Sequence, residues 1–272
     1  MTHRTLREEV TVEGVGLHSG RRCRLVLLPR EEPGLVVRGA SGPVPLSLRA
    51  VEADERRTRA AGVATVEHLL AALYVAGVSA AELVVDGGEV PAGDGSAWVF
   101  WEAVQAAGTR PLREPRPVLR VAEPVWVRDG GRLCAALPGE GLRVTYVVEL
   151  RDRPAQALDV VVTAQTFARQ LASARTWGYR EEAAALHAAG LALGATEQNT
   201  LVLEDGGYRN PPRFPDEPVR HKVVDLVGDL ALLGAEVHAH VVAVRAGHRT
   251  HLALARRMAE AAGLARPEGE GK

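Results

Sequence analysis

Aromatic side chains are scarce in this sequence of 272 residues, of which Phe, Tyr and Trp together make up 4%. So few rings argue against a surface that stacks on the bases of single-stranded nucleic acid. The formal net charge of −1 also gives no overall attraction to nucleic acid or to an anionic membrane. We therefore expect no nucleic-acid partner.

The sequence also lacks long apolar segments. The longest, at residues 69–78, has about half the length that a membrane-spanning helix needs. The N-terminal segment is charged and contains no apolar signal core. Cysteine is rare as well, and Cys23 and Cys134 have no partner at metal-ligand spacing, so reduced thiols are expected. These observations predict a cytoplasmic protein without stable membrane insertion.

Apart from these absences, the composition is that of an ordinary globular protein, with 46% hydrophobic and 25% charged residues. A chain of this length can form one large domain or two small ones. Residues 108–117 contain three prolines and no apolar period, which is typical of a linker. We therefore predict two domains, at 1–110 and 118–272, joined by a linker at 111–117.

The two predicted domains share an order of elements. In the first, a helix is expected at 65–76, with Thr65 as its N-cap, followed by a strand at 82–86. In the second, the helix that carries His221 is expected to end near residue 234, before a strand at 237–245. Each helix has a histidine near its N-terminus, and a glycine-containing loop follows each strand. This order suggests a duplicated α+β unit with a site between the halves.

The remaining elements are predicted from apolar periodicity and turn residues. A strand at 35–38 is expected to pair with one at 23–28. Other strands are expected at 118–127, 133–137, 142–149 and 200–203, and helices at 97–107, 166–175, 180–189 and 251–262.

The most informative pattern places His221 and Asp225 four residues apart within an apolar helical segment. Residues at i and i+4 share one helical face, a spacing at which an imidazole and a carboxylate can hold one metal ion. The simpler interpretation is a solvent-facing helix on which both residues are incidental. However, burying an unpaired carboxylate among the surrounding valines and leucines is costly, and a metal ion would neutralise it.

Glu67 and His68 form a second polar pair in a similar setting. Adjacent helical residues point about 100° apart, so these two cannot easily ligate one ion together. The natural division makes His68 a ligand and Glu67 the general base for a water on that ion. The alternative is a capping glutamate beside a hydrogen-bonded histidine. With His221 and Asp225, His68 would complete the three protein ligands typical of a catalytic zinc site.

Four more polar residues are candidates for chemistry. His248 follows a predicted strand, where it is either simply exposed or a general acid that Asp229 holds charged. His18, framed by glycines, is a similar case and a candidate for substrate contact. Lys222 is one of two lysines in the chain, and it either serves a phosphate or an oxyanion or extends into solvent. Thr176 is a candidate oxyanion donor, although a structural turn is the simpler interpretation of its surroundings.

Taken together, these residues lie in seven motifs that resemble the zinc-dependent UDP-3-O-acyl-N-acetylglucosamine deacetylases of lipid A synthesis. The motifs follow the family's order and span nearly the whole chain, so their combination is far more specific than any one of them. They are GVGLHSG (14–20), TVEHLLAAL (65–73), DGSA (94–97), ARTWGY (174–179), GLALG (190–194), VRHKVVD (219–225) and GH (247–248).

The resemblance implies an α+β fold of two similar domains, each a helix layer packed on a small sheet with an insert, and an active site at the domain interface. It assigns a zinc ion, with Fe2+ as a substitute, to His68, His221 and Asp225. It makes Glu67 the base that activates the zinc-bound water.

The other roles also follow from the resemblance. His248 would protonate the leaving amine with support from Asp229, and Thr176 would bind the oxyanion. The residues that would contact the substrate are Lys222, His18, Arg245 and Trp177.

The implied reaction is hydrolysis of the acetamide of UDP-3-O-acyl-N-acetylglucosamine, which releases acetate and UDP-3-O-acyl-glucosamine in the committed step of lipid A biosynthesis. Zinc suits this chemistry, because it lowers the pKa of a bound water to about 7 and polarises the carbonyl. The partner would be a small-molecule UDP-sugar with an acyl chain, and the enzyme a monomer. The alanine-rich helix at 180–189 is a candidate to line an acyl passage.

The sequence departs from the family's pattern in four places. Residues 54–62 are shorter than the family's segment, residues 151–156 replace an aromatic and His-Pro stretch, Gln198 stands where Asp is common, and Trp177 where Phe is usual. The departures at 151–156 and at Gln198 motivate a second hypothesis: a diverged member that binds a related nucleotide sugar or acyl ligand with altered or no deacetylase activity. A third is a non-haem iron oxygenase, which also uses two histidines and one carboxylate. Its ligands usually lie on the strands of a β-barrel, whereas two of the predicted ligands here share a helix.

Overall fold

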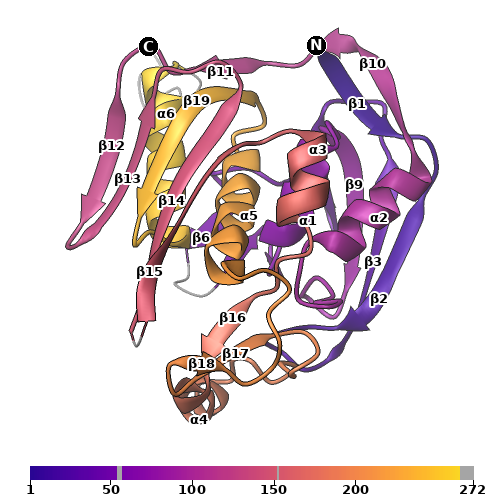
Figure 1. Cartoon of the computed structure of the whole chain (residues 1–272). Helices are drawn as coiled ribbons and strands as arrows, with labels where there is room; N and C mark the ends of the chain where they lie inside the picture. Colours follow the sequence, from indigo (N-terminus) through magenta and orange to yellow (C-terminus); the bar gives the residue numbers. More distant parts are fainter. Residues whose placement is uncertain (54–56, 152, 264–272) are drawn as a thin grey trace.

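Two β-sheets face each other across a layer of helices in this computed structural model, which describes residues 1–53, 57–151 and 153–263 (Figure 1). One sheet comes from the first half of the chain and the other from the second half. Helices from each half pack on their own sheet and meet in the middle. The architecture confirms the expected α+β class, with a helix layer on a sheet in each half.

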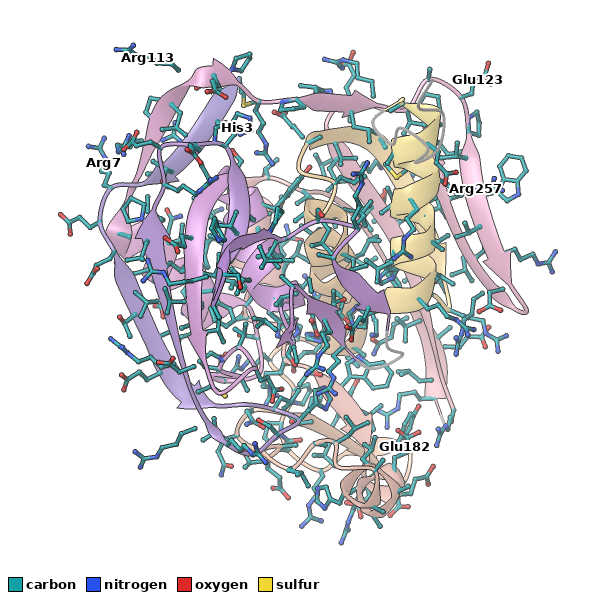
Figure 2. All side chains as sticks on the ribbon, turned by 180° about the vertical axis from the view of Figure 1, so that it is seen from behind. His3, Arg7, Arg113, Glu123, Glu182 and Arg257 are labelled. Carbon is teal, nitrogen blue, oxygen red and sulfur yellow. The ribbon has the colours of Figure 1, made fainter. Side chains whose placement is uncertain are left out.

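The first sheet has seven strands in the order β10-β1-β9-β3-β2, with β4 paired to β9 and to β5. They are β1 (Thr2–Leu6), β2 (Val10–Val15), β3 (Arg22–Pro29), β4 (Gly34–Gly39), β5 (Gly42–Pro45), β9 (Ala80–Asp86) and β10 (Thr109–Pro115). In β3, buried Cys23, Leu25 and Leu27 alternate with less buried residues, so one face of the sheet turns to the helices α1 (Glu67–Val75) and α2 (Trp98–Ala107). Seen from behind, Arg7 and Arg113 project outward from this half, while His3 is buried against Ser79 (Figure 2).

The second sheet has six strands in the order β12-β13-β19-β14-β15, with β11 paired to β19. They are β11 (Val118–Arg120), β12 (Val125–Asp129), β13 (Arg132–Leu137), β14 (Leu142–Leu150), β15 (Arg153–Val161) and β19 (Glu236–Val244). Every second residue of β19 is buried, and this inner face packs against α5 (Glu217–Ala231) and α6 (His248–Ala261). Between β15 and the second insert, the chain forms the short α3 (Ala164–Thr166) and a π-helical turn (Phe167–Leu171).

Each half also contributes a small three-stranded sheet that lies outside its main sheet. The first insert consists of β6 (Val51–Ala53), β7 (Thr58–Ala60) and β8 (Val63–Ala64). The second consists of β16 (Trp177–Tyr179), β17 (Leu201–Glu204) and β18 (Gly207–Tyr208), together with a 3-10 turn (Arg180–Glu182) and α4 (Ala183–Ala188). The second insert lies at the lower edge of the molecule in the view of Figure 1.

The repeated order of elements predicted from the sequence is present in both halves. Helix α1 leads into β9 in the first half, and α5 leads into β19 in the second. Each of these strands is paired on both sides, so each histidine-bearing helix is followed by an interior strand. Helices α1 and α5 pack directly on each other, which brings the two halves into contact at the predicted site.

Three local expectations were wrong. Strand β4 pairs with β9 instead of β3, because both edges of β3 are already taken by β2 and β9. Helix α1 begins at Glu67, and Thr65 does not cap it: Thr65 adopts a positive φ of 59° and its hydroxyl donates to Glu89 Oε1. The predicted strand at 118–127 is two strands, β11 and β12, on different parts of the second sheet.

The predicted linker also differs, since much of it belongs to strand β10, which pairs with β1. Its prolines are tolerated because β10 is an edge strand. It has a neighbouring strand on one side only, so a proline without an N–H interrupts no hydrogen bonds to a second neighbour. The chain passes from one sheet to the other after Pro115. The domain division at 1–110 and 118–272 stays a prediction. Within the described ranges, no helix is both long and apolar enough to cross a bilayer.

The contact between α1 and α5 depends on Gly228. A Cβ atom added there would lie 2.0 Å from the carbonyl oxygen of Glu67, so the two helix backbones approach as closely as they do only because this residue has no side chain. We expect Gly228→Ala to lower the free energy of unfolding by about 2 kcal/mol. The steric clash destabilises the folded state by up to about 3 kcal/mol, and the higher helix propensity of alanine offsets about 1 kcal/mol of this loss.

Urea unfolding of the purified variant measures this effect. Gly207→Ala is the matched control, because its added Cβ would meet its nearest neighbour at an ordinary 3.6 Å. Its stability is expected to change by less than about 0.5 kcal/mol. Equal stability of the two variants would show that the helices are free to separate at Gly228 at no cost.

Candidate active site

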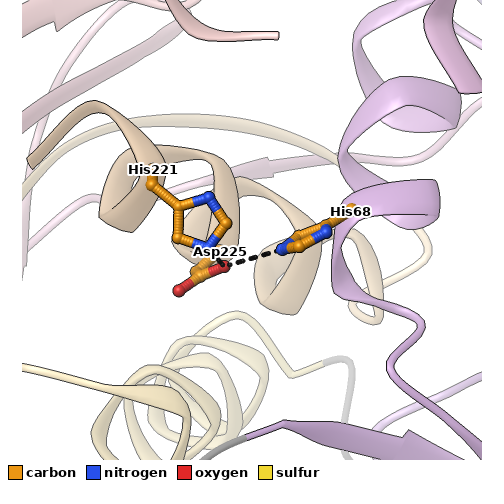
Figure 3. Close-up of side chains that lie close together, drawn as sticks. All are labelled: His68, His221 and Asp225. Atoms are coloured by element: carbon orange, nitrogen blue, oxygen red, sulfur yellow. Dashed lines mark ion pairs between the residues drawn. The ribbon is translucent and has the colours of Figure 1, made fainter. Parts of the chain in front are cut away.

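Helices α1 and α5 bring three potential metal ligands together where they cross. His221 and Asp225 lie one turn apart on α5, and His221 Nε2 is 3.3 Å from Asp225 Oδ1. His68, near the start of α1, places its Nε2 3.4 Å from the same oxygen. Figure 3 shows both imidazoles pointing toward the carboxylate from different helices. The sequence predicted the pairing on α5, and the packing of α1 on α5 supplies the third group.

Burial and charge put His221 and Asp225 into the forms that bind a metal. All three side chains, His68 included, are nearly inaccessible. Loss of solvation lowers the pKa of His221 to about 4, which keeps its imidazole neutral at pH 7. Burial pushes the pKa of Asp225 upward, but His221 and Lys222 outweigh it and hold that pKa well below its ordinary value. A neutral imidazole and an ionised carboxylate are both competent ligands.

The hydrogen bonding of one atom in this cluster is incomplete among the described residues. Asp225 Oδ1 is buried and has no hydrogen-bond partner within the described part of the chain, an arrangement that ordinarily costs about 1–3 kcal/mol. His221 does not donate to it, because its Nδ1 donates to the carbonyl oxygen of Ala174 at 3.1 Å and its Nε2 therefore carries a lone pair in the neutral ring.

The Nε2 lone pair of His221, the Nε2 atom of His68 and a carboxylate oxygen of Asp225 therefore lie close together, and a divalent cation fits them. The donor set of two imidazoles and one carboxylate suits zinc and also Fe2+. These ligands come from helices, which counts against the β-barrel iron oxygenases.

Glu67 lies beside this cluster as a buried carboxylate at the first position of α1. The backbone N–H of Thr58 donates to its Oε2 at 3.1 Å. Burial raises the pKa of Glu67, although His248 and His68 oppose the rise. A buried carboxyl group with a raised pKa, next to a potential metal site, has the character of a general base.

His248 faces the cluster from the start of α6, which begins earlier than the sequence predicted because the Thr250 hydroxyl accepts the N–H of Gly247 at 2.9 Å. His248 Nδ1 donates to Asp229 Oδ2 at 2.8 Å, and its Nε2 lies 3.8 Å from Asp225 Oδ2. Burial opposes the charge on His248, but Asp229, with Asp225 and Glu67, raises its pKa to about 9. The imidazole is therefore protonated at neutral pH.

Three residues around Asp229 were missed by reasoning from the sequence. The Thr58 hydroxyl donates to Asp229 Oδ1, and His251 Nδ1 donates to Oδ2 at 2.8 Å. The Tyr146 hydroxyl in turn lies 2.9 Å from His251 Nε2. The only signal for His251 was its place three residues after His248, one turn along α6. Nothing near Thr58 or Tyr146 in the sequence points to this site.

A pocket of about 300 Å³ collects the predicted residues. The sequence-predicted residues that line it are His18, Glu67, His68, Thr176, Trp177, His221, Lys222, Asp225, Arg245 and His248. Asp229 does not line it, because it lies fully buried behind His248. The residues that line the pocket come from helices that pack on each of the two main sheets, from the loop after β2 and from the second insert. The pocket therefore lies between the two halves.

The predicted substrate-contacting residues differ in how firmly the fold holds them. Lys222 Nζ lies 2.8 Å from Asp225 Oδ2, and Arg245 pairs with Glu149 at 3.3 Å on the rim. Trp177 Nε1 donates to the carbonyl oxygen of Pro218 at 3.3 Å. These contacts fix the orientation of the Trp177 indole and place two cations near the pocket.

Glu89 anchors the loop that carries His18. Its carboxylate accepts the N–H of His18 at 2.9 Å and that of Ser19 at 2.8 Å. Gly16 makes this possible, since a Cβ there would lie 2.3 Å from Glu89 Oε2. From the opposite side, the N–H of Ala192 donates to His18 Nδ1 at 3.3 Å, which ties the loop to the second insert.

Of the four departures from the family's pattern, Trp177 lines the pocket and the segment 54–62 contains Thr58, which bonds to Glu67 and Asp229. Of residues 54–62, 54–56 lie outside the described residues, as does residue 152 of the segment 151–156. Arg151 pairs with Glu181 and Glu182 on the second insert, and Gln156 Oε1 accepts the N–H of Val219 near the start of α5 at 3.2 Å. Gln198 is exposed in the loop before β17.

The comparisons with known proteins agree with the motifs. The family model described as "LpxC: UDP-3-O-acyl N-acetylglycosamine deacetylase" matches residues 3–260. The chain is 40% identical to the UDP-3-O-acyl-N-acetylglucosamine deacetylase of Thermosynechococcus vestitus, over 95% of this chain and 94% of the relative. It is 36% identical to that of Leptospira biflexa, over 93% and 88%, and 38% identical to that of Syntrophotalea carbinolica, over 90% and 83%.

The fold, the pocket and these matches define the chain as a member of a deacetylase family. It belongs to the LpxC family, as the resemblance of the seven motifs predicted.

Proposed function

We propose that this chain is a zinc-dependent hydrolase that removes the acetyl group of UDP-3-O-acyl-N-acetylglucosamine, within the cytoplasm and as a monomer, in lipid A synthesis. One observation carries the proposal: Asp225 Oδ1, which has no hydrogen-bond partner among the described residues, lies beside the Nε2 atoms of His68 and His221 in a pocket that a buried glutamate and a protonated histidine also reach. Membership of the LpxC family identifies the substrate class.

His68, His221 and Asp225 would hold the metal, and Fe2+ is the alternative occupant of the same donor set. When bound, such an ion supplies a Lewis acid and lowers the pKa of a water ligand to about 7.

Glu67 accepts a proton from the attacking water. Its Oε2 accepts a hydrogen bond from the Thr58 N–H, so Oε1 is the oxygen proposed to accept the proton of a water in the pocket. Its raised pKa makes it a stronger base than an exposed carboxylate, so it holds the proton better once the water has added to the acetamide carbon.

His248 and Thr176 complete the reaction. The charge that develops on the acetamide oxygen is stabilised by a hydrogen bond from the Thr176 hydroxyl. His248 is protonated at neutral pH, and Asp229 fixes its ring through Nδ1, so Nε2 gives its proton to the sugar nitrogen as the carbon–nitrogen bond breaks. Acetic acid and the free amine leave, the acid gives its proton to solvent as acetate, and the proton held by Glu67 restores His248.

The rest of the pocket matches the ends of the substrate. Lys222 and Arg245, with Arg132 and Arg249, place positive charge along one side, which suits the diphosphate. Apolar groups lie on the side of the second insert, where Leu186 of α4 lines the pocket, and they suit the acyl chain. His18 and Trp177 also line the pocket and would orient the sugar.

The proposal is tested by incubating the zinc-loaded protein with UDP-3-O-acyl-N-acetylglucosamine and measuring acetate and free amine. Equal amounts of both products are expected, and chelation of the metal is expected to stop their release. The diverged-member hypothesis predicts the opposite result, in which the nucleotide sugar binds at saturation and no acetate appears. UDP-N-acetylglucosamine without the acyl chain serves as the matched substrate control and is expected to react more slowly.

A further inference from the structure

Thr58 contacts both the proposed base Glu67 and the proposed acid His248, although it lies on none of the helices α1, α5 and α6 that form the site. It is the first residue of β7 in the first insert and is fully buried. Its backbone N–H donates to Glu67 Oε2 at 3.1 Å, and its side-chain hydroxyl bonds to Asp229 Oδ1. The same hydroxyl oxygen lies 3.1 Å from His248 Nδ1. One residue therefore touches the base, the acid and the carboxylate behind the acid.

The directions of these hydrogen bonds follow from the chemistry of the groups. An ionised carboxylate only accepts, so the Thr58 hydroxyl must donate to Asp229 Oδ1. His248 Nδ1 donates its proton to Asp229 Oδ2 at 2.8 Å. The Thr58 oxygen then has a lone pair left, which faces the same Nδ1–H. The imidazole is thus held from two sides, by the carboxylate and by the hydroxyl.

Asp229 needs this donor. Its Oδ2 already accepts from His248 and His251, each at 2.8 Å, whereas Thr58 provides the hydrogen bond to Oδ1. Without the hydroxyl, a buried carboxylate oxygen would lack its donor, and the carboxylate would be free to rotate toward another partner. Rotation of Asp229 would turn the His248 ring with it, because the ring is oriented through Nδ1.

We propose that Thr58 is a positioning residue that aligns the base Glu67 with the acid pair His248–Asp229. It comes from the insert of the first half, while Asp229 and His248 come from α5 and α6 of the second half. The backbone N–H of Thr58 holds the carboxylate of Glu67, which belongs to the same half of the chain. Its hydroxyl holds the pair His248–Asp229, which belongs to the other half. This role rests on the proposed deacetylase function.

The test is a pair of substitutions assayed by acetate release. Thr58→Val keeps the shape and the N–H to Glu67 but removes the hydroxyl, and kcat is expected to fall on the order of 10- to 100-fold. The KM and the zinc content are expected to stay within about twofold, because no ligand of either kind is removed. Thr58→Ser keeps the hydroxyl and is expected to restore kcat to within about threefold of the wild type.

Thr5→Val is the matched control. Thr5 is also fully buried on a strand and its hydroxyl also makes a hydrogen bond, accepting the N–H of Arg30 at 2.8 Å, but it lies in the first sheet away from the pocket. Its kcat is expected to equal that of the wild type. Circular dichroism and the urea midpoint establish that each variant is folded.

The outcomes separate the two proposals. A wild-type protein that releases no acetate contradicts the deacetylase function itself. An active wild type with a Thr58→Val variant of unchanged kcat overturns the role of Thr58, as does a Ser variant that stays as slow as the Val variant. A loss that appears in KM or in zinc content overturns it too. If Thr58→Val and Thr58→Ala both fail to fold while Thr58→Ser folds, the residue serves stability and the proposal is wrong.

Discussion

Replacing Glu67 by glutamine is expected to lower kcat for acetate release by about a thousandfold without loss of the metal, which is within the range that a positioned general base contributes. The reason is local. Glutamine has the size of glutamate, and its carbonyl oxygen can still accept the Thr58 N–H that now bonds to Oε2. The side chain keeps its place on α1 but can no longer accept a proton from water.

The metal content distinguishes a base from a ligand. Glu67 precedes His68 on the helix, and adjacent residues diverge by about 100°, so Glu67 is not expected to share the ion with its neighbour. Zinc analysis of the purified Gln variant is therefore expected to give the same stoichiometry as the wild type. A variant that loses zinc and activity together would make Glu67 a ligand, and one that keeps its rate would remove it from the mechanism.

Glu82→Gln is the matched control for this substitution. Glu82 lies on β9 of the first sheet, and its carboxylate pairs with Arg38 at the surface. The change removes one carboxylate charge, as it does at Glu67, but far from the pocket. Both zinc content and kcat are expected to be unaltered, since surface ion pairs contribute about 1 kcal/mol of stability at most.

The elements and residues that the sequence predicted well are those whose signal is local. The spacing of His221 and Asp225 fixes their common face once the segment is a helix, and an apolar run of that length can hardly be anything else. The proposed division of Glu67 and His68 into base and ligand rests on the angle of about 100° between neighbouring helical residues and stays a prediction. For His248 the sequence left two interpretations open, an exposed loop residue or a general acid held charged by Asp229, and the family resemblance favoured the second.

What the sequence could not show are contacts made by packing. Thr58 and Asp229 are joined by a hydrogen bond across 171 positions of the chain, and only the docking of the first insert on α5 and α6 brings them together. The partner of β4 was wrong for the same reason, since strand pairing depends on which edges other strands have already taken. The prolines of β10 led to the prediction of a linker instead of a strand. Proline disrupts a strand that has neighbouring strands on both sides but is tolerated at the edge of a sheet, and the sequence does not show which case applies.

Asp225→Ala is expected to remove stoichiometric zinc and to lower kcat on the order of 1000-fold or more, since the metal supplies several kcal/mol of transition-state stabilisation. The substitution removes one of the three proposed protein ligands and also the negative charge opposite His68 and His221. Asp86→Ala, at the exposed end of β9, is the matched control and is expected to keep both zinc and rate.

Stability gives a readout of the same site that does not depend on turnover. A cation that binds only the folded wild type raises its free energy of unfolding by about 2.7 kcal/mol when it is present at 100 times its dissociation constant. Asp225→Ala is expected to show no such gain. Each protein is compared with and without zinc, because the variant also loses the ion pair between Asp225 Oδ2 and Lys222 Nζ, and its stability without metal is expected to be lower than that of the wild type. Equal stabilisation of both proteins by zinc would place the ion elsewhere in the molecule.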